Sequence, residues 1–232
     1  MKLRYNIIFK IVKKSRTLKF KVVNLPMSFK LVIVDYGTGN VNSVKRMMDR
    51  MKVNSIISSD PKDIISCQKI ILPGIGHFGK AMSKLKELNL LDILHKAVLV
   101  KQTPVLGICL GMHLMAKKSE EGNVEGLGWF DSEVIKFNVS DKIKHKIPHI
   151  GWNQISIKKN SLLMNNISEL SEFYFAHSYH LRINNQSDVL NETQYDFIYP
   201  SAIEKDNIFG VQYHPEKSHD AGSQLLKNFI EL

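Results

Sequence analysis

The stretch P-V-L-G-I-C-L-G-M-H-L-M, residues 104–115, decides the fold of this chain. Residues 105–108 form a continuous apolar run typical of a buried strand, and residues 110–117 have the pattern of a helix directly behind it. Gly107 and Gly111 lie two residues on either side of Cys109. This spacing is typical of a sharp strand-to-helix elbow, where neighbouring backbone comes too close for a β-carbon. The stretch therefore predicts a nucleophile at the carboxyl end of a strand in an α/β sheet.

Cys109 is the stronger candidate for a nucleophile among the two cysteines. The predicted helix begins near Leu110, and the dipole at its N-terminus favours a thiolate over a thiol. The alternative is a buried structural cysteine, which suits Cys67 because it has neither flanking glycines nor an elbow. Two cysteines also exclude a disulfide-stabilised scaffold and a cysteine-rich zinc module.

The segment V-Q-Y-H-P-E-K, residues 211–217, offers a base and a group to orient it. Pro215 restricts His214 to extended backbone, and residues two apart on extended backbone point the same way. Glu216 can therefore approach the imidazole and fix its tautomer, as a cysteine nucleophile requires of its base. These residues predict a Cys-His-acid arrangement for acyl transfer. No His/Cys/Asp cluster has metal-ligand spacing, so we expect no metal.

From residue 30 the chain alternates short apolar strands with helical segments, which favours a parallel sheet covered on both faces. We predict a three-layer, doubly wound α/β domain over residues 28–232, with a mostly parallel sheet and antiparallel additions after Gly128. The expected strands are 31–34, 53–57, 69–72 and 105–108, the antiparallel additions 134–137, 155–157, 173–175 and 209–213, and the helices 44–51, 78–100 (broken near Asn89), 110–117 and 224–230.

The formal charge of +10 comes mostly from one end of the chain. Residues 1–27 hold eight Lys or Arg and no acid, which leaves 24 basic against 22 acidic residues, a net of +2, for the rest. This extension is compatible with a basic amphipathic helix for a membrane or RNA surface, or with a transit-like segment. We expect instead a disordered extension or a reading frame whose true start is Met27. The near-neutral body and the lack of a membrane-length apolar run argue against nucleic-acid and membrane partners.

Two further glycine-rich segments lie between a strand and a helix. Gly37-Thr38-Gly39-Asn40 lacks the third glycine of a dinucleotide loop, because Asn42 stands there, so we interpret it as a tight turn. In Pro73-Gly74-Ile75-Gly76, small residues allow backbone N–H groups to face a ligand.

Together these segments resemble the class I (triad) glutamine amidotransferases, and within them the glutaminase subunits of imidazole glycerol phosphate synthase. The resemblance covers residue 29 to the C-terminus, and its motifs follow one another in the family's order. They are VDYGTGN (34–40), LPGIGHFGKAM (72–82), PVLGICLGMHLM (104–115), EGLGW (125–129), IPHIGWN (147–153), FAHSYH (175–180) and GVQYHPEKS (210–218).

The resemblance implies roles for individual residues. It makes Cys109, His214 and Glu216 the catalytic triad. It implies an oxyanion hole formed by the N–H of Leu110 and an amide of the 74–76 loop, from Ile75 or Gly76. It also implies substrate contacts from Gly74, Gly111, His113, His177, Ser178 and Tyr179, and partner contacts from Asn40 and Lys217.

The chemistry implied by the resemblance is hydrolysis of L-glutamine without a cofactor. The ammonia would pass to a cyclase or synthase subunit, expected to be a (β/α)₈ barrel, in a cytoplasmic heterodimer. His113 stands where the family usually has glutamine. This difference leaves open a paralogue that supplies ammonia for amidation of nonulosonic or other surface-polysaccharide sugars. A further alternative is a non-catalytic scaffold that stabilises a synthase partner, against which the intact triad residues argue.

Overall fold

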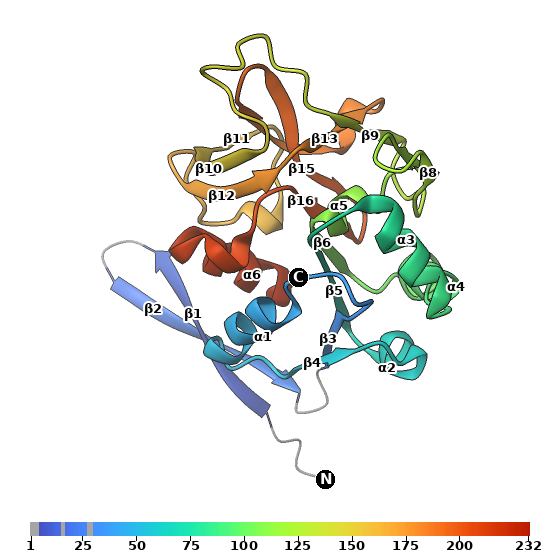
Figure 1. The fold of residues 1–232 in the computed structure, drawn as a ribbon. Helices are drawn as coiled ribbons and strands as arrows, with labels where there is room; N and C mark the ends of the chain where they lie inside the picture. The colour runs from blue at the N-terminus through green and yellow to red at the C-terminus, as the bar shows by residue number, and fades with distance from the viewer. Residues whose placement is uncertain (1–4, 15–16, 27–29) are drawn as a thin grey trace.

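The computed structural model describes residues 5–14, 17–26 and 30–232, and its centre is an eight-stranded sheet (Figure 1). The strand order is β11-β14-β15-β16-β6-β5-β3-β4. The five strands from β16 to β4 are parallel, and β15, β14 and β11 extend the sheet antiparallel. Their bounds are β3 (Leu31–Val34), β4 (Ser55–Ser58), β5 (Lys69–Gly74), β6 (Val105–Cys109), β11 (Ser156–Ile157), β14 (Val189–Gln194), β15 (Ile198–Lys205) and β16 (Ile208–Val211).

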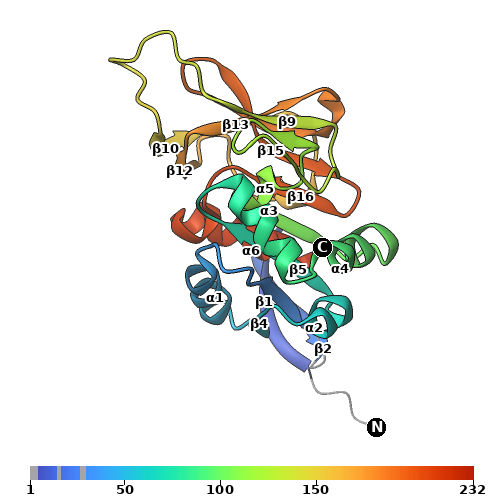
Figure 2. The same ribbon diagram turned by 45° about the vertical axis from the view of Figure 1, so that its right-hand side comes forward.

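Helices cover both faces of the parallel half of this sheet (Figures 1 and 2). Alternate residues of β3 face opposite layers: Leu31 and Ile33 pack with buried residues of α1 and α6, whereas Val32 and Val34 pack with those of α2, α3 and α4. The three-layer α/β fold predicted from the sequence is therefore confirmed. The helices are α1 (Val41–Arg50), α2 (Pro61–Ser66), α3 (Phe78–Glu87), α4 (Leu91–His95), α5 (Leu110–His113) and α6 (His219–Glu231), with a π-helical segment at Lys96–Val100 after α4.

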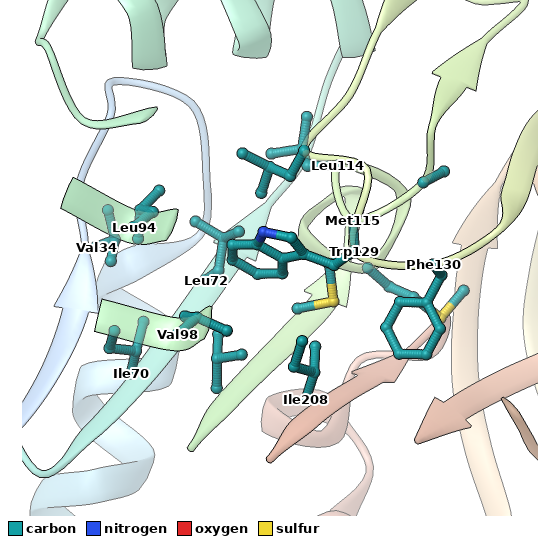
Figure 3. Packing of buried hydrophobic residues seen from close by; sticks show 14 of the residues in the cluster. Val34, Ile70, Leu72, Leu94, Val98, Leu114, Met115, Trp129, Phe130 and Ile208 are labelled. Atoms are coloured by element: carbon teal, nitrogen blue, oxygen red, sulfur yellow. The ribbon is translucent and has the colours of Figure 1, made fainter. Parts of the chain in front are cut away.

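Trp129 packs the segment that follows α5 against the helical layer that contains α2, α3 and α4 (Figure 3). Its ring lies among apolar side chains of β5, of the helical region after Leu90 and of the α5 segment, and is 4% exposed. The indole Nε1 donates a hydrogen bond to His95 Nδ1 at 3.2 Å. Packing and a hydrogen bond therefore hold the α5 segment in place.

Smaller sheets lie beyond the carboxyl end of β6, at the top of Figure 1. One has the order β13-β9-β7-β8, and the other pairs β10 with β12. These two sheets bring the residues on either side of His177 to the carboxyl end of the parallel strands. Their bounds are β7 (Lys118–Ser119), β8 (Val124–Glu125), β9 (Ser132–Lys136), β10 (His149–Gln154), β12 (Glu172–His177) and β13 (Tyr179–Ile183), with short 3₁₀ turns at Leu162–Met164, Gln186–Asp188 and Pro215–Lys217.

Two of the predicted elements differ from the structure for reasons that lie in long-range pairing, and α2 was not predicted. The helix expected over 110–117 ends at His113. The reason is long-range pairing, because the carbonyls of Leu114 and Ala116 accept hydrogen bonds from the N–H groups of Leu127 and Gly128. The strand expected over 209–213 as an antiparallel addition is β16, which runs parallel to β6 and antiparallel to β15. The change from parallel to antiparallel pairing therefore lies between β16 and β15, and not between β6 and β16.

The basic extension contains two strands, β1 (Tyr5–Lys14) and β2 (Thr17–Pro26), which form an antiparallel sheet of their own. This hairpin differs from the disordered segment and the amphipathic helix considered for these residues. The expected start at Met27 lies outside the described residues, and the domain boundary at residue 28 stays a prediction. Over the described ranges, none of the helices is both long and apolar enough to cross a bilayer.

Candidate active site

Cys109 occupies the strand-to-helix elbow that the glycine spacing predicts. It is the last residue of β6, and its φ of 52° and ψ of −109° are a strained backbone conformation for a residue with a side chain. A β-carbon on Gly111 would lie 1.7 Å from the carbonyl oxygen of Leu72. A β-carbon on Gly107 would lie 2.7 Å from the carbonyl group of Gly111. Both glycines are therefore required by close backbone approach.

His214 and Glu216 form a buried pair beside this elbow. His214 Nδ1 lies 2.8 Å from Glu216 Oε1, and the two side chains are 2% and 1% exposed. The backbone also fixes the histidine: its N–H donates to the carbonyl of Tyr174 at 2.9 Å, and its carbonyl accepts from Ser218 Oγ at 2.6 Å. With Nδ1 donating to the carboxylate, Nε2 remains for the nucleophile.

The electrostatics of this pair favour a protonated imidazole. Burial by itself lowers the pKa of His214, but hydrogen bonds to Cys109 and Glu216, together with their negative charges, raise this pKa from 6.5 to about 10. At neutral pH the imidazole is therefore held as an imidazolium between sulfur and carboxylate. Among the described residues, the second carboxylate oxygen, Glu216 Oε2, is buried without a hydrogen-bond partner.

A cavity of about 290 Å³ opens at Cys109. It brings together most of the residues that the resemblance assigns to the oxyanion hole and the substrate. The predicted residues that line it are Ile75, Gly76, Cys109, Leu110, His113, His177, Ser178 and Tyr179.

Four lining residues were not predicted. Pro148 and Ile150 belong to the motif at 147–153, and Ala176 belongs to the motif at 175–180. Their position in recognised motifs was the available signal. Glu121 also lines the cavity and lies in no motif, and we find no sequence signal for it.

Besides the buried pair His214 and Glu216, four predicted site residues do not line this cavity. Gly74 lies behind it, where a β-carbon would be 2.5 Å from the Tyr36 hydroxyl and 2.8 Å from Leu110 Cβ, and Gly111 packs on β5 as described. The side chain of Asn40 donates to Glu216 Oε1 at 3.4 Å. The ammonium of Lys217 lies 5.5 Å from the centre of the Tyr174 ring. The contacts of Asn40 and Lys217 with a partner stay predictions.

Gln212, which the sequence analysis gave no role, connects His113 to the sulfur of Cys109. Its Oε1 lies 2.7 Å from His113 Nε2, and its Nε2 donates to Cys109 Sγ at 3.8 Å. Burial lowers the pKa of His113 from 6.5 to about 4, so this ring is neutral at neutral pH. The sequence signal available for Gln212 was its position two residues before His214, on the same side of extended backbone.

A second hydrogen-bonded chain supports the far wall of the cavity. The hydroxyl of Tyr199 lies 3.1 Å from His149 Nδ1 and 3.2 Å from His177 Nε2. His177 Nδ1 donates to the carbonyl of Tyr179 at 2.7 Å. Burial lowers the pKa of His149 to about 4 and that of His177 well below 6.5, so both rings are neutral. Neutral His177 must then accept from the Tyr199 hydroxyl, which fixes the direction of the whole chain.

Within the described ranges, no group of three or more His, Cys, Asp or Glu side chains is arranged to hold a metal ion. The groups available for chemistry at this site are the thiol of Cys109, which lines the cavity, the imidazolium of His214 hydrogen-bonded to it, and the backbone N–H groups near them.

The fold and the sequence are those of a known family. Residues 32–232 match the family model of the class-I glutamine amidotransferases, and the chain belongs to this family. The chain is 47% identical over 201 residues to the imidazole glycerol phosphate synthase subunit HisH 2 of Methanococcus maripaludis, covering 87% of this chain and 98% of the relative. It is 42% identical over 202 residues to the protein of the same name from Pseudomonas aeruginosa, covering 87% and 99%.

Solved structures show the same fold at low sequence identity. One is the PurLQS structure from Thermotoga maritima, with a TM-score of 0.68 at 15% identity, covering 88% of this chain and 99% of that chain. Another is the crystal structure of a glutamine amidotransferase, with a TM-score of 0.67 at 16% identity, covering 86% and 97%. These neighbours confirm the predicted α/β fold class.

Proposed function

We propose that this chain is the glutaminase subunit of an imidazole glycerol phosphate synthase, hydrolysing L-glutamine to glutamate and ammonia. The observation that carries the proposal is the position of Cys109 on a strained elbow, beside the buried His214–Glu216 pair and at the mouth of a cavity. The relatives of 42% and 47% identity, which carry the name of this synthase subunit, support the same activity.

In the proposed reaction His214 first donates a proton and later accepts one. The Cys109 sulfur attacks the side-chain amide carbon, and His214 transfers its proton to the nitrogen as ammonia leaves. Water then attacks the glutamyl thioester and gives a proton back to His214, which releases glutamate and restores the sulfur. Glu216 keeps the imidazole in the tautomer that presents Nε2 and stabilises its positive charge throughout.

Backbone N–H groups around the cavity are suited to stabilise the oxyanion. Leu110 is the first residue of α5, so its N–H has no partner within that helix. Ile75 and Gly76 line the same cavity from the loop after β5. We propose Leu110 as the fixed donor and an amide of the loop as the second, each contributing on the order of 10²–10³ in rate.

The ammonia requires an acceptor, because hydrolysis alone wastes glutamine. We propose a cyclase partner, a (β/α)₈ barrel, which receives the ammonia in a cytoplasmic heterodimer, as suits nucleotide metabolism. The support is that both relatives are named as a subunit of this synthase.

Two observations favour testing a second acceptor for the ammonia. In Methanococcus maripaludis there are two relatives of this name, and this chain is 47% identical to HisH 2 but 37% identical to HisH 1. His113 also stands where the family usually has glutamine. Both facts suit a paralogue whose partner aminates a surface-polysaccharide or nonulosonic sugar. Co-purification of the partner followed by mass spectrometry distinguishes the two acceptors.

The glutaminase proposal is tested by measuring ammonia release from glutamine, with the partner present. Cys109→Ala is expected to give a folded protein that binds glutamine and releases no ammonia. Cys67→Ala is the matched control and is expected to keep activity, because Cys67 is buried and its thiol donates to the carbonyl of Ile64. Equal loss in both variants would contradict the assignment, and a wild-type chain without any activity would favour the scaffold alternative.

A further inference from the structure

We propose that Gln212 is a positioning residue for the nucleophile: its side-chain N–H groups hold the sulfur of Cys109, and His113 fixes the direction in which this amide points. The proposal rests on the glutaminase function proposed above. It assigns a role to a buried amide that the triad and the oxyanion hole do not use.

The geometry places one continuous chain of polar atoms behind the nucleophile. Gln212 has no exposed surface, and its backbone N–H donates to the carbonyl of Ser201 at 2.9 Å, so the residue is fixed at the end of β16. Its side chain spans from His113 Nε2, at 2.7 Å, to Cys109 Sγ, at 3.8 Å. His113, 4% exposed, is the last residue of α5, the helix that begins immediately after Cys109.

Only one orientation of the amide suits an anionic sulfur. If His113 Nε2 carries the proton, it donates to the carbonyl oxygen of Gln212, and the NH₂ group faces the sulfur. If the proton is on Nδ1, the amide must turn over, and its carbonyl oxygen faces the sulfur. That oxygen repels a thiolate, whereas the NH₂ group stabilises it. The tautomer of His113 and the ionisation of Cys109 are therefore linked through Gln212.

The other titratable groups around the sulfur fit this arrangement. His214 is protonated at neutral pH and pairs with Glu216 on its far side. The phenols of Tyr36 and Tyr199 also interact with Cys109, and burial raises the pKa of each well above its usual value, so both stay neutral. His214 is thus the cationic partner of the sulfur, and Gln212 supplies a neutral donor from another side.

The proposal predicts an effect on the ionisation of Cys109 before it reacts with substrate. A hydrogen bond to sulfur favours the thiolate and fixes its position, but it weakens once charge moves from sulfur to the substrate oxygen. Loss of Gln212 should therefore change the ionisation of Cys109 more directly than it changes stabilisation of the oxyanion.

The test measures the rate of alkylation of Cys109 by iodoacetamide as a function of pH, in a Cys67→Ala background so that one thiol reacts. Gln212→Leu removes the donor and is expected to raise the midpoint pH of alkylation by about 1, since a hydrogen bond to a charged group contributes roughly a tenfold preference. His113→Leu is expected to raise the midpoint in the same direction by less. His113→Gln restores a donor for the Gln212 carbonyl and is expected to return the midpoint to that of the parent.

A structural role alone gives a different pattern. Ile64→Ala, in α2 and remote from the cavity, is the control: it should lower the melting temperature and leave the midpoint unchanged. The double variant Gln212→Leu with His113→Leu should have the midpoint of Gln212→Leu alone. Should Gln212→Leu not fold, the comparison of His113→Leu with His113→Gln decides the question.

An unchanged midpoint in Gln212→Leu and His113→Leu, or equal effects of His113→Leu and His113→Gln, would overturn the proposal. Alkylation requires neither glutamine nor a partner, so this outcome is distinguishable from failure of the glutaminase function, which is measured by ammonia release.

Discussion

The α-carbon of Gly111 lies so close to Leu72 that an added β-carbon would fall 1.7 Å from the Leu72 carbonyl oxygen. Because that oxygen belongs to the backbone of β5, it cannot move aside as a flexible side chain can. The contact presses the first turn of α5 against β5 and thereby fixes the direction of the elbow at Cys109. The position of Cys109 is thus fixed by a backbone contact two residues away.

Gly111→Ala is therefore expected to destabilise the protein by about 3 kcal/mol, because strand and helix must separate to admit one methyl group. Urea denaturation measures this loss. Gly79→Ala is the matched control, because its nearest neighbour is a side chain, the ring of His77 at 3.3 Å, and not a backbone carbonyl. It is expected to be neutral or slightly stabilising, since alanine is favoured over glycine within α3. Similar losses in both variants would refute the role assigned to the Leu72 contact.

Stability is expected to reach its maximum near pH 6.5 and to fall on both sides. Burial lowers the pKa of His113 and of His149 from 6.5 to about 4, so below pH 6.5 the unfolded chain binds protons that the native chain does not. Stability is then lost as pH falls from 6.5 towards 4, with a slope approaching about 1.4 kcal/mol per pH unit for each histidine. His214 has the opposite sign, because its pKa is raised to about 10. Its contribution is present in full below pH 6.5 and is lost as pH rises to about 10.

Urea denaturation at half-unit steps of pH checks both limbs. Cys109→Ala is expected to weaken the alkaline limb, because it removes a hydrogen bond and a negative charge that hold the proton on His214. The same substitution should leave the acid limb in place. A profile that stays flat from pH 6.5 to 4 would contradict the neutral, buried state of His113 and His149.

The sequence was sufficient for the parts of the fold and the site that depend on local pattern. The apolar run before Cys109, with Gly107 and Gly111, predicted the elbow, and Pro215 between His214 and Glu216 predicted their pairing. The alternation of strands and helices predicted the layers. Each of these features is encoded within a few residues, where period and steric restriction are informative.

What the sequence did not predict depends on distant residues. The early end of α5 follows from hydrogen bonds between Leu114 and Leu127, and the direction of β16 follows from its pairing with β6. The Gln212–His113 contact joins residues 99 positions apart. The helix α2 was missed for another reason, because its six residues are too few for a helical period, although Asp60 caps it through the N–H of Lys62.

Tyr199→Phe is expected to raise the KM for glutamine with a smaller change in kcat. The substitution keeps the buried ring and removes the hydroxyl that connects His149 to His177, whose other nitrogen holds the carbonyl of Tyr179 in the cavity wall. Tyr195→Phe is the matched control, since Tyr195 packs near the same aromatic residues but its hydroxyl donates to the carbonyl of Lys146. Steady-state kinetics of ammonia release measures both variants. An equal rise in KM for the two would show that the wall does not depend on the Tyr199 hydroxyl.

The last prediction concerns the loop that we propose as the source of the second oxyanion donor. Gly76 lines the cavity with a φ of 109°, and a β-carbon there would meet no atom within 4 Å among the described residues. The elbow at Cys109, in contrast, is held by β5, β6 and α5. We therefore expect the loop, and not the elbow, to be the element that a partner switches, by turning a peptide so that its N–H faces the oxyanion. The isolated chain should turn over glutamine slowly and accelerate by at least about 100-fold with its synthase and acceptor, the effect of one recovered donor.

Gly76→Ala separates this switch from a general loss of stability. Alanine disfavours positive φ, so the variant should reduce stimulation by the partner more than it reduces basal turnover. Gly128→Ala is the matched control, because Gly128 also has a positive φ, of 68°, and open space around its α-carbon, but it does not line the cavity. Both variants are expected to lose about 1 kcal/mol of stability, and only Gly76→Ala should lose stimulation. Ammonia release with and without partner measures the difference. Full activity of the isolated wild-type chain would show that the second donor is already in place, and it would contradict the prediction that the loop is a switch.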